Sequence, residues 1–359
     1  MTVSPLPVVF EPIYRPKPWG GRRLATLLGK RLPGDGPIGE SWELSDLPGN
    51  ESRVHDGPLA GTTLHELVAT WGRGLLGDAL LVAGRFPLLV KFLDARENLS
   101  VQVHPKLGTG TYLPKPGTGA LPRQLGARKM GTGTAPQRLG ASPHFPPVKH
   151  EAWYVLHADP GTKLYIGLRP GVGPDDVARA ADTPAIVDLL QTWNATPGEC
   201  YYLPSGTPHA LGAGVVVAEV QTPSDVTYRL YDWGRVGLDG RPRELHIEQA
   251  LANIRYDVTP EMIRSAEPPR AASDGSLRLV ACDCFAIDGV ELPTGATREL
   301  PHGRMAIWII LSGTGRLVAG NCECRFGAGD VVLVPGGCAH VLSELASPCT
   351  YLAAGIPSR

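Results

Sequence analysis

The chain has 359 residues, a formal net charge of −1 and a hydrophobic content of 43%. This length suits two domains, and the near-zero charge argues against a nucleic acid or a charged membrane surface as partner. No apolar run reaches the ~18 residues of a membrane helix, and the N-terminal stretch lacks the basic-then-apolar pattern of a signal peptide. We therefore expect a cytoplasmic protein without membrane association.

The 44 glycines and 35 prolines favour short strands joined by tight turns. Helical spacing is confined to three stretches, 62–82, 174–192 and 246–253. Thr62 or Thr63 can cap the first of these helices, and Pro174 suits the first turn of the second. Strands are predicted at 39–45, 86–95, 99–104, 149–156 and 215–221. The pattern predicts a mainly β fold with a few short helices.

One predicted strand carries three polar residues on a single face. Ser100, Gln102 and His104 alternate with Val101 and Val103, and alternate side chains of a strand share a face. A hydroxyl, an amide and an imidazole form a poor core surface but a suitable start for a metal site. The alternative is an exposed edge strand with polar residues outward.

Lys91 interrupts an apolar strand, where an unpaired charge is costly to bury. It either reaches the edge of the sheet or serves an anion. The 99–104 strand follows directly, so we expect these two strands to be neighbours.

Residues 105–148 are rich in Gly, Pro and Thr, and no Asp or Glu occurs between Asn98 and His150. Little apolar periodicity is present, so we predict a long loop inserted within a domain. Its basic character could form a lid that attracts phosphate, but a tolerated insertion is favoured.

The pattern G-x₅-P-x-G-x₂-H occurs twice, from Gly198 to His209 and from Gly329 to His340. Each copy predicts a strand, a tight turn and a histidine at the start of the next strand. This pattern resembles a motif of the cupins, which implies tandem jelly-roll β-barrels. We expect a catalytic cupin domain over 1–265, with 105–148 as its inserted loop, and a degenerate cupin domain over 275–359.

The two copies differ upstream of the histidine. Aligning the strands places Ala306 where Glu151 stands, and no Gln-x-His precedes the second copy. The second barrel is therefore predicted to be structural, with His340 as a non-ligand histidine and one functional site in the first barrel.

The predicted metal ligands are Gln102, His104, Glu151 and His209, which come from three strands of one barrel. Two imidazoles, a carboxylate and an amide suit a borderline divalent ion. Zn²⁺, one per chain, is favoured by affinity, and Mn²⁺, Co²⁺ and Fe²⁺ are alternatives.

Two cysteine pairs are also notable, Cys282-x-Cys284 and Cys322-x-Cys324. Together they could form a four-thiolate zinc site, but common zinc modules use C-x₂-C spacing. Buried, reduced thiols are the favoured interpretation.

Four segments together resemble the type I mannose-6-phosphate isomerase (phosphomannose isomerase) family of the cupin superfamily, in its short bacterial form. They are Ser-Val-Gln-Val-His-Pro at 100–105, Lys-His-Glu-Ala-Trp-Tyr at 149–154, Leu-Pro-Ser-Gly-Thr-Pro-His-Ala at 203–210 and the segment around Arg229. The resemblance implies that the four predicted ligands bind zinc. It covers nearly the whole chain except the 105–148 insertion.

The resemblance also implies roles for other residues. Lys91 and Ser100 match positions that line the active site, and Glu43 is a weaker candidate near its rim. Arg229 matches the active-site arginine, and Arg235 stands where a second cation binds the sugar phosphate. The alternative for these arginines is a surface pair neutralised by Asp225 and Asp232.

Three further residues match catalytic positions of the family: Lys149, Glu219 and Asp225. The implied reaction interconverts mannose 6-phosphate and fructose 6-phosphate through a cis-enediol. Lys149, Asp225, His104 and Glu219 all stay open as acid or base. We expect a monomer or homodimer that binds a small sugar phosphate. An Fe²⁺-dependent cupin oxygenase and a non-catalytic sugar-phosphate-binding cupin are the alternative functions.

Overall fold

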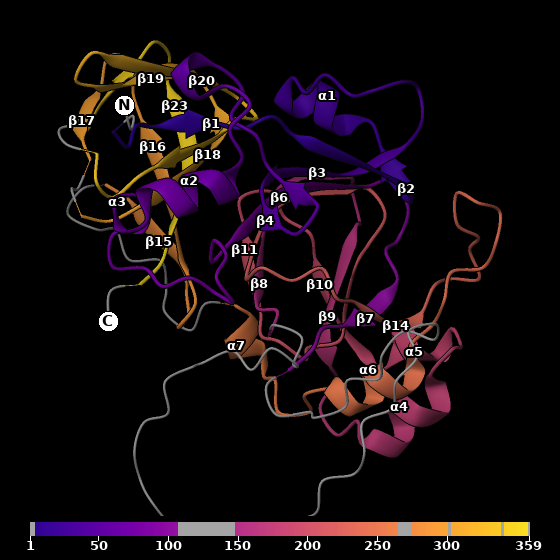
Figure 1. The fold of residues 1–359 in the computed structure, drawn as a ribbon. Coiled ribbons are helices and arrows are strands. Elements are labelled where there is room, and N and C mark those ends of the chain that lie inside the picture. The colour runs from indigo at the N-terminus through magenta and orange to yellow at the C-terminus, as the bar shows by residue number, and fades with distance from the viewer. Residues whose placement is uncertain (1–3, 107–147, 265–274, 301–302, 339–340, 358–359) are drawn as a thin grey trace, which may run out of the picture.

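The computed structural model describes residues 4–106, 148–264, 275–300, 303–338 and 341–357. Two β-barrels lie side by side, and a few short helices pack around them (Figure 1). The predicted class, a mainly β protein with tandem cupin barrels, is confirmed. Within the described residues, no helix is long and apolar enough to cross a membrane.

The first barrel is built from two facing antiparallel sheets. One sheet has the order β11-β8-β13-β6-β2-β3, and the other has the order β10-β9-β12-β7-β14. The strands of the first sheet are β11 (Cys200–Leu203), β8 (Glu151–Ala158), β13 (Val215–Gln221), β6 (Leu89–Ala95), β2 (Ile13–Gly21) and β3 (Ile38–Leu44). Those of the second are β10 (Leu190–Asn194), β9 (Lys163–Leu168), β12 (His209–Leu211), β7 (Val101–Val103) and β14 (Tyr228–Tyr231).

The second barrel pairs a six-stranded sheet with a four-stranded one. The larger sheet contains β1 (Val8–Val9), β21 (Val331–Val334), β18 (Ala306–Ser312), β23 (Cys349–Gly355), β16 (Ala286–Leu292) and β15 (Leu277–Ala281). The smaller sheet contains β17 (Thr297–Glu299), β22 (Val341–Leu345), β19 (Thr314–Ala319) and β20 (Cys322–Gly327). A separate short pair is formed by β4 (Asp46–Leu47) and β5 (Asn50–Glu51).

The predicted helices are present but shorter. The 62–82 stretch forms α2 (Leu64–Trp71) and α3 (Arg73–Leu76), which are separated at Gly72. Thr63 and Glu66 form the capping box of α2. The 174–192 stretch forms α4 (Pro174–Ala180) and α5 (Ala185–Asp188), and its last residues belong to β10. The remaining helices are α1 (Arg23–Leu28), the 3₁₀ turn η1 (Gly57–Leu59), α6 (Ile247–Asn253) and α7 (Pro260–Ile263).

The 86–95 and 99–104 strands, which we expect to be neighbours, do not pair with each other. β6 lies in one sheet of the first barrel, and β7 lies in the facing sheet. The chain crosses between the sheets at residues 96–100, so Lys91 and Gln102 approach the barrel interior from opposite walls.

One hydrophobic cluster joins the two barrels. It contains Phe92 and Ala218 from the first barrel and Ile307 and Leu333 from the second, all fully buried, and the α2 residue Leu64. In β18 the alternate residues Trp308 and Ile310 instead face the interior of the second barrel. The two barrels therefore share a core in addition to their own interiors.

The N-terminal strand also crosses between the barrels. β1 pairs with β21, with Val8 opposite Leu333 and Val9 opposite Val332, so it completes a sheet of the second barrel (Figure 1). These residues fall within the predicted 1–265 domain. The proposed division at 265–275 therefore separates the barrels but not this strand.

A test of the junction between the barrels uses Gly77, whose backbone bridges to Arg304. A Cβ at Gly77 would lie 2.1 Å from the carbonyl oxygen of Gly303, whereas a Cβ at Gly84 would meet nothing within 4 Å. Both glycines have positive φ, so both alanine variants carry the strain of that conformation. We expect Gly77→Ala to lower the free energy of unfolding by about 2 kcal/mol more than Gly84→Ala, measured by urea denaturation. Equal losses would contradict the described contact.

Candidate metal centre

Three buried side chains from the two facing sheets of the first barrel converge on one point. His209 begins β12 and lies opposite Gln102 of β7, while His104 follows one residue after β7 ends. Glu151 begins β8 in the facing sheet. The exposed fraction is 2% for His104 and 1% for both Glu151 and His209, so the group lies inside the barrel.

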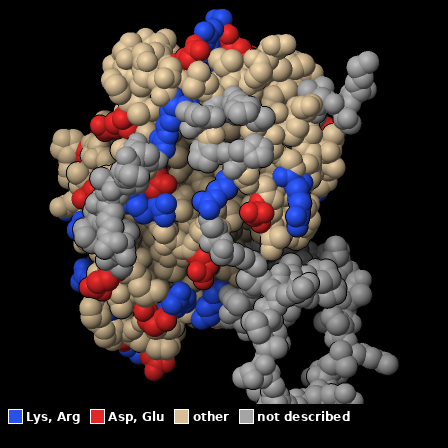
Figure 2. Space-filling model, turned by 90° about the vertical axis from the view of Figure 1, so that its left-hand side faces the viewer, with Lys and Arg blue, Asp and Glu red and all other residues tan. Residues whose placement is uncertain are grey.

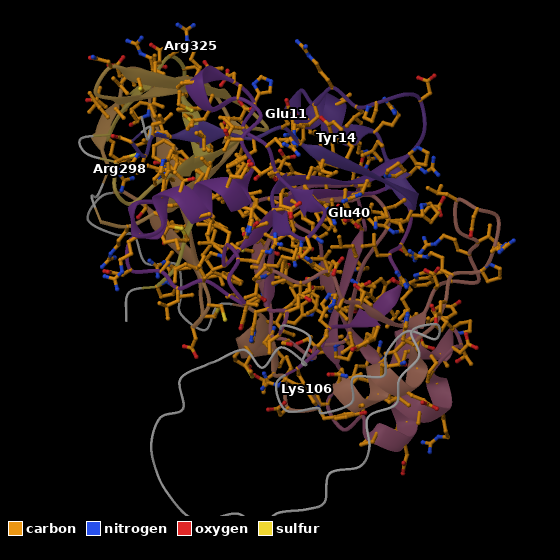
Figure 3. The ribbon with its side chains drawn as sticks, in the orientation of Figure 1. Glu11, Tyr14, Glu40, Lys106, Arg298 and Arg325 are labelled. Carbon is orange, nitrogen blue, oxygen red and sulfur yellow. The ribbon has the colours of Figure 1, made fainter. Side chains whose placement is uncertain are left out.

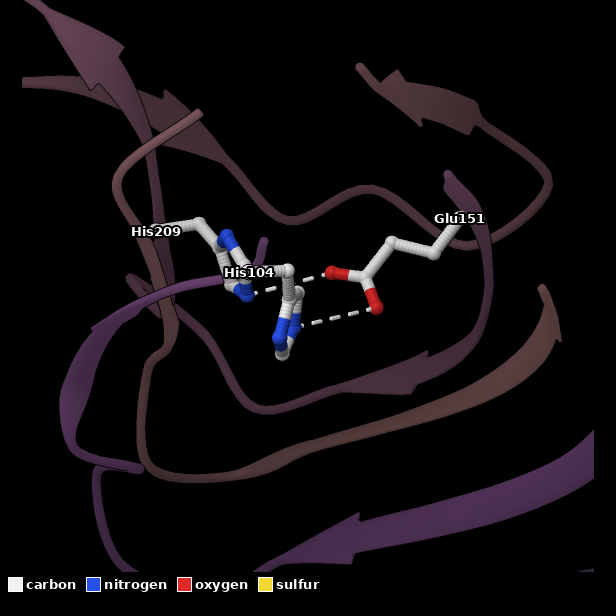
Figure 4. A group of neighbouring side chains, drawn as sticks. All are labelled: His104, Glu151 and His209. Atoms are coloured by element: carbon white, nitrogen blue, oxygen red, sulfur yellow. Dashed lines mark ion pairs between the residues drawn. The ribbon is translucent and has the colours of Figure 1, made fainter. Parts of the chain in front are cut away.

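The distances between these atoms suit a four-coordinate ion. Glu151 Oε1 lies 3.1 Å from His209 Nε2, and Glu151 Oε2 lies 3.5 Å from His104 Nε2 (Figure 4). The Gln102 amide lies 3.2 Å from His209 Nε2. Ligands bound ~2.0–2.1 Å from a tetrahedral ion stand ~3.4 Å apart. His104, Glu151 and His209 could therefore hold a single metal ion, and their chemistry suits Zn²⁺ and neighbouring metals; Gln102 faces the group with its amide nitrogen.

Outer hydrogen bonds orient both imidazole rings. His104 Nδ1 donates to the carbonyl of Val226 at 2.8 Å, and His209 Nδ1 donates to the carbonyl of Thr207 at 2.8 Å. Each ring thus carries its proton on Nδ1 and presents the Nε2 lone pair to the centre, as metal-ligating histidines do. The Glu151 Oε1 atom is buried without a hydrogen-bond donor among the described residues, which leaves it available to a cation.

Ser100 supports the amide ligand. Its hydroxyl donates to Gln102 Oε1 at 3.2 Å. A half-turn of the amide would present Oε1 to an ion and NH₂ to the serine, which can accept as readily as it donates. Ser100 is buried on the metal side of β7, the face predicted from the alternation.

Charge around the centre holds the ligands in the protonation states that bind metal. Burial and the Lys149 ammonium lower the pKa of His104 to about 4. Burial also lowers the pKa of His209. Burial alone would raise the pKa of Glu151, but Lys149 and the two histidines hold it well below its usual value. Near neutral pH the centre therefore offers two neutral imidazoles and a carboxylate.

Lysines and glutamates alternate along the wall beside the centre. Lys149 contacts Glu151 and lies 2.9 Å from His104 Nε2, where it supplies the positive charge that a metal would supply. Its ammonium also lies 3.6 Å from Glu219 Oε1, and Lys91 lies 3.1 Å from the same oxygen. Glu219 can therefore hold Lys149 when a cation binds Glu151.

The Lys91 ammonium is buried rather than at an edge. It lies in one row with Glu219, Trp153 and Trp42, which pair across β6, β13, β8 and β3. The Trp153 indole donates to Glu219 at 2.8 Å. Burial opposes the charge, but Glu219 and Glu40 outweigh it and raise the pKa of Lys91. The row thus keeps the positively charged Lys91 side chain inside the barrel.

Glu40 is a carboxylate of this wall that sequence reasoning missed. It accepts a 2.7 Å hydrogen bond from Trp42 and lies 3.1 Å from Lys17 Nζ. Figure 3 shows it in the first barrel, away from the second barrel that carries Arg298 and Arg325. The signal was the alternation of the 39–45 strand, which places Glu40 and Trp42 on one face.

Glu43 lies on the other side of that sheet. It is 2% exposed, 2.7 Å from Lys30 Nζ, and accepts a hydrogen bond from Ser41. Ser41 is opposite Phe92, which faces the core shared by the barrels. The structure therefore corrects the expectation that Glu43 lies near the rim of the site. A bulge between Trp42 and Leu44 shifts the alternation there.

Arg229 lies opposite Gln102 across β14 and β7, and Arg235 lies further along the chain. Asp232 pairs with Arg235 at 2.7 Å and also with Arg243, but it does not pair with Arg229. In the described part of the chain, no carboxylate forms an ion pair with Arg229, and its Nε has no hydrogen-bond acceptor. Burial and the neighbouring Arg243 lower its pKa. Its charge is thus left for a ligand.

Two other predicted site residues, Asp225 and Arg235, do not contact the metal centre. Asp225 is exposed and makes no contact with the centre, although the neighbouring Val226 carbonyl orients His104. Arg235 is buried against Asn98 and lines a small surface pocket with Glu97, Asn98 and Trp233. The suggested surface pair with Asp225 is therefore not formed.

Within the ranges that the structure describes, this is the one group of three His, Cys, Asp or Glu side chains that could hold a metal ion. In the second barrel Ala306 begins β18, as Glu151 begins β8. Neither cysteine pair belongs to such a group, and all seven thiols are free. His340 and residues 107–147 of the insertion lie outside the described residues.

The fold and the site define the class of protein: a cupin whose first barrel holds a candidate metal centre. Residues 9–118 match the description "Phosphomannose isomerase type I, catalytic domain", and residues 290–354 match "Cupin domain".

The chain is 30% identical to the mannose-6-phosphate isomerase ManA of Bacillus subtilis, over 97% of this chain and 98% of that protein. It is also 30% identical to a mannose-6-phosphate isomerase of Streptococcus mutans, over 92% of each. A crystal structure of the Bacillus subtilis mannose 6-phosphate isomerase aligns with a TM-score of 0.79 and 26% identity, covering 98% of this chain and 99% of that one. The chain belongs to the type I phosphomannose isomerase family of metal-dependent aldose–ketose isomerases.

Replacing a ligand tests the centre. We expect His209→Ala to lower Zn²⁺ affinity by more than the ~10–100-fold that loss of an outer hydrogen bond costs, measured by competition with a chromophoric chelator. His157→Ala is the matched control, because His157 lies near the far end of β8 and pairs with Asp159 at 3.2 Å. Unchanged affinity in His209→Ala would refute the ligand assignment.

The charge on Glu40 makes a pH-dependent contribution to stability. Burial raises its pKa, but Lys91 and Lys17 outweigh this and lower it from 4.5 to about 2. An acid whose pKa falls on folding stabilises the fold above its unfolded value, and that stabilisation is lost as pH falls toward the folded value. We expect Glu40→Gln to cost up to about 3 kcal/mol of unfolding free energy at pH 7. The cost should shrink between pH 4.5 and pH 3 in urea titrations; a constant cost would contradict this origin.

Proposed function

We propose that this protein interconverts mannose 6-phosphate and fructose 6-phosphate. The observation that carries the proposal is the buried His104–Glu151–His209 centre beside a wall of alternating lysines and glutamates. Such an interior offers ligands for a metal ion, positively charged side chains that can bind a phosphorylated sugar, and side chains that can transfer protons. The two curated relatives of the same length bear the name of this activity.

The proposed metal ligands are Gln102, His104, Glu151 and His209. Zn²⁺ is the proposed ion, because two imidazoles and a carboxylate without a thiolate suit it. When bound, the ion supplies Lewis-acid polarisation of the sugar carbonyl. The outer bonds from the two histidines to backbone carbonyls fix the rings before any ligand binds.

The proposed phosphate-binding groups are Arg229 and Arg235, with Lys91 and Ser100 lining the sugar site. Arg229 supports this best, because its guanidinium forms no ion pair with a carboxylate of the described chain. A planar guanidinium binds phosphate oxygens in pairs. Arg235 and Arg243 share Asp232, and Arg235 also lies 3.8 Å from Glu97, so the carboxylates that form ion pairs in this corner serve Arg235 and Arg243.

Proton transfer between C1 and C2 is assigned to the lysine–glutamate wall, through a cis-enediol. Lys149 and Glu219 are the proposed acid and base, since both are buried beside the metal ligands. Asp225 stays a candidate only if the loop that carries it moves, because its side chain points to solvent. His104 is less suited, since its Nε2 serves the metal.

The catalytic cupin domain is proposed to span residues 1–265, apart from β1, with the 275–359 barrel as support. The remaining sequence expectations are a cytoplasmic location, a monomer or homodimer, and no nucleic-acid partner. Figure 2 shows basic and acidic side chains interspersed over the face that it draws.

The phosphate assignment is tested by Arg229→Ala. A charge-assisted hydrogen bond contributes about 1.5–3 kcal/mol, so KM for mannose 6-phosphate should rise about 10- to 100-fold. Arg229→Lys should recover part of this loss, and Arg325→Ala on the outside of the second barrel should match the wild type. A coupled assay measures the rates.

The same assay, run before and after chelation and Zn²⁺ restoration, tests the role of the metal centre. Activity that survives complete metal removal would overturn the proposed role of the metal centre.

An Fe²⁺-dependent oxygenase is not favoured, because it leaves the buried Lys91 and the uncompensated Arg229 without a function. A binding protein without turnover is not favoured either, because Lys149 and Glu219 complete an acid–base wall at the metal. Measuring oxygen uptake and mannose 6-phosphate turnover in one preparation distinguishes the isomerase, the oxygenase and the binding protein.

A further inference from the structure

A cysteine pair lies at the junction of the two barrels, outside the metal centre. Cys282 and Cys284 occupy the turn between β15 and β16, which is closed by a 2.9 Å hydrogen bond from the Cys282 N–H to the Phe285 carbonyl. Both side chains are partly exposed and pack at the edge of the shared core. The turn rests on β11 of the first barrel, where Phe285 meets the ring of Tyr202 edge-on at 6.2 Å.

The turn forms a binding site for a thiolate at Cys282. The Cys284 thiol, the backbone N–H groups of Cys284 and Phe285 and the Tyr202 hydroxyl surround this sulfur and favour its thiolate. These groups lower the pKa of Cys282 to about 7, with Cys284 the largest contributor. Burial instead raises the pKa of Cys200 and Cys338 to about 12. Thiolates are the nucleophilic form of cysteine, so Cys282 is the nucleophile of this pair.

The second pair of the same spacing provides a comparison within the protein. Cys322 and Cys324 lie in the extended strand β20, where residues two apart stand about 6.6 Å apart at Cα. That separation is near the upper end of the usual range of disulfides, about 4.4–6.8 Å, whereas the chain reverses direction at Cys282–Phe285 and draws the turn pair closer. Burial also raises the pKa of Cys324 to about 12. The turn pair is therefore better suited to oxidation than the strand pair.

We propose that Cys282 and Cys284 form a reversible redox pair, in which hydrogen peroxide converts the two thiols into an intramolecular disulfide where the barrels meet. The Cys282 thiolate attacks one peroxide oxygen, the O–O bond breaks, and the hydroxide that leaves takes up a proton to form water. The resulting sulfenic acid is attacked by the Cys284 sulfur, which loses its proton as the S–O bond breaks and a second water leaves. Two thiols thus lose two electrons and two protons, and the peroxide is reduced to two waters.

The pair also touches the surroundings of the metal centre. The Tyr202 hydroxyl that serves Cys282 lies 2.7 Å from His150 Nδ1, and His150 precedes the proposed ligand Glu151. Tyr202 therefore connects the cysteine turn to the residue that precedes Glu151. A disulfide in a reducing compartment is usually transient, which suits a modification site rather than a structural bridge.

The test is peroxide titration of the purified full-length protein, followed by thiol alkylation, peptide mapping and intact mass. We expect the wild type and Cys322→Ser/Cys324→Ser to lose two thiols per chain, with recovery by dithiothreitol. Cys282→Ser/Cys284→Ser should lose none at the same dose. Tyr202→Phe should slow the reaction about threefold or more, since it removes one donor to the thiolate.

A single variant keeps the test independent of disulfide geometry. In Cys284→Ser, which lacks the second thiol, Cys282 should accumulate as a sulfenic acid that dimedone traps. Loss of thiols at Cys322 and Cys324 instead, or the same reaction rate at Cys282 and Cys324, would overturn the proposal. Irreversible oxidation of Cys282 in the wild type would overturn it as well.

Discussion

The first barrel is organised around one buried negative charge. The carboxylate of Glu151 is 1% exposed and lies between two imidazoles and an ammonium group. A buried carboxylate without counter-charge is strongly destabilising, so the surrounding side chains must supply positive charge or a metal. Lys149 meets this need within the chain itself, and Glu219 and Lys91 extend the compensation inward. The Lys149 ammonium has a second counter-charge in Glu219, whose Oε1 lies 3.6 Å away.

The strand register builds this wall. Because paired residues of neighbouring strands share a face, one row of Trp153, Glu219, Lys91 and Trp42 spans four strands. The facing sheet supplies Gln102 and His209 as another such pair. A metal between the rows would link the two sheets inside the barrel.

In the described part of the second barrel, no group of three His, Cys, Asp or Glu side chains could hold a metal ion. Ala306 begins β18, where a carboxylate begins β8, and the interior around Trp308 and Ile310 is apolar. Its outer face shares a core with the first barrel, and β1 extends its sheet from the other end of the chain. The second barrel thus packs against the first through this shared core, and the cysteine turn lies at their junction.

The sequence alone determined which side chains share a face, because the period of two in a strand is a local property. This was enough to place Gln102 and His104 on one face; the repeated motif added His209, the 149–156 strand added Glu151, and the resemblance to the cupins implied the two barrels. Only the tertiary structure decided between Glu40 and Glu43, since the pairing of β3 with β6 determines which face of β3 lies beside Lys91. It also decided that Asp232 neutralises Arg235 and Arg243 rather than Arg229, that β6 and β7 lie on opposite walls, and that β1 joins the second barrel. These outcomes depend on pairings between distant segments, which local periodicity does not specify.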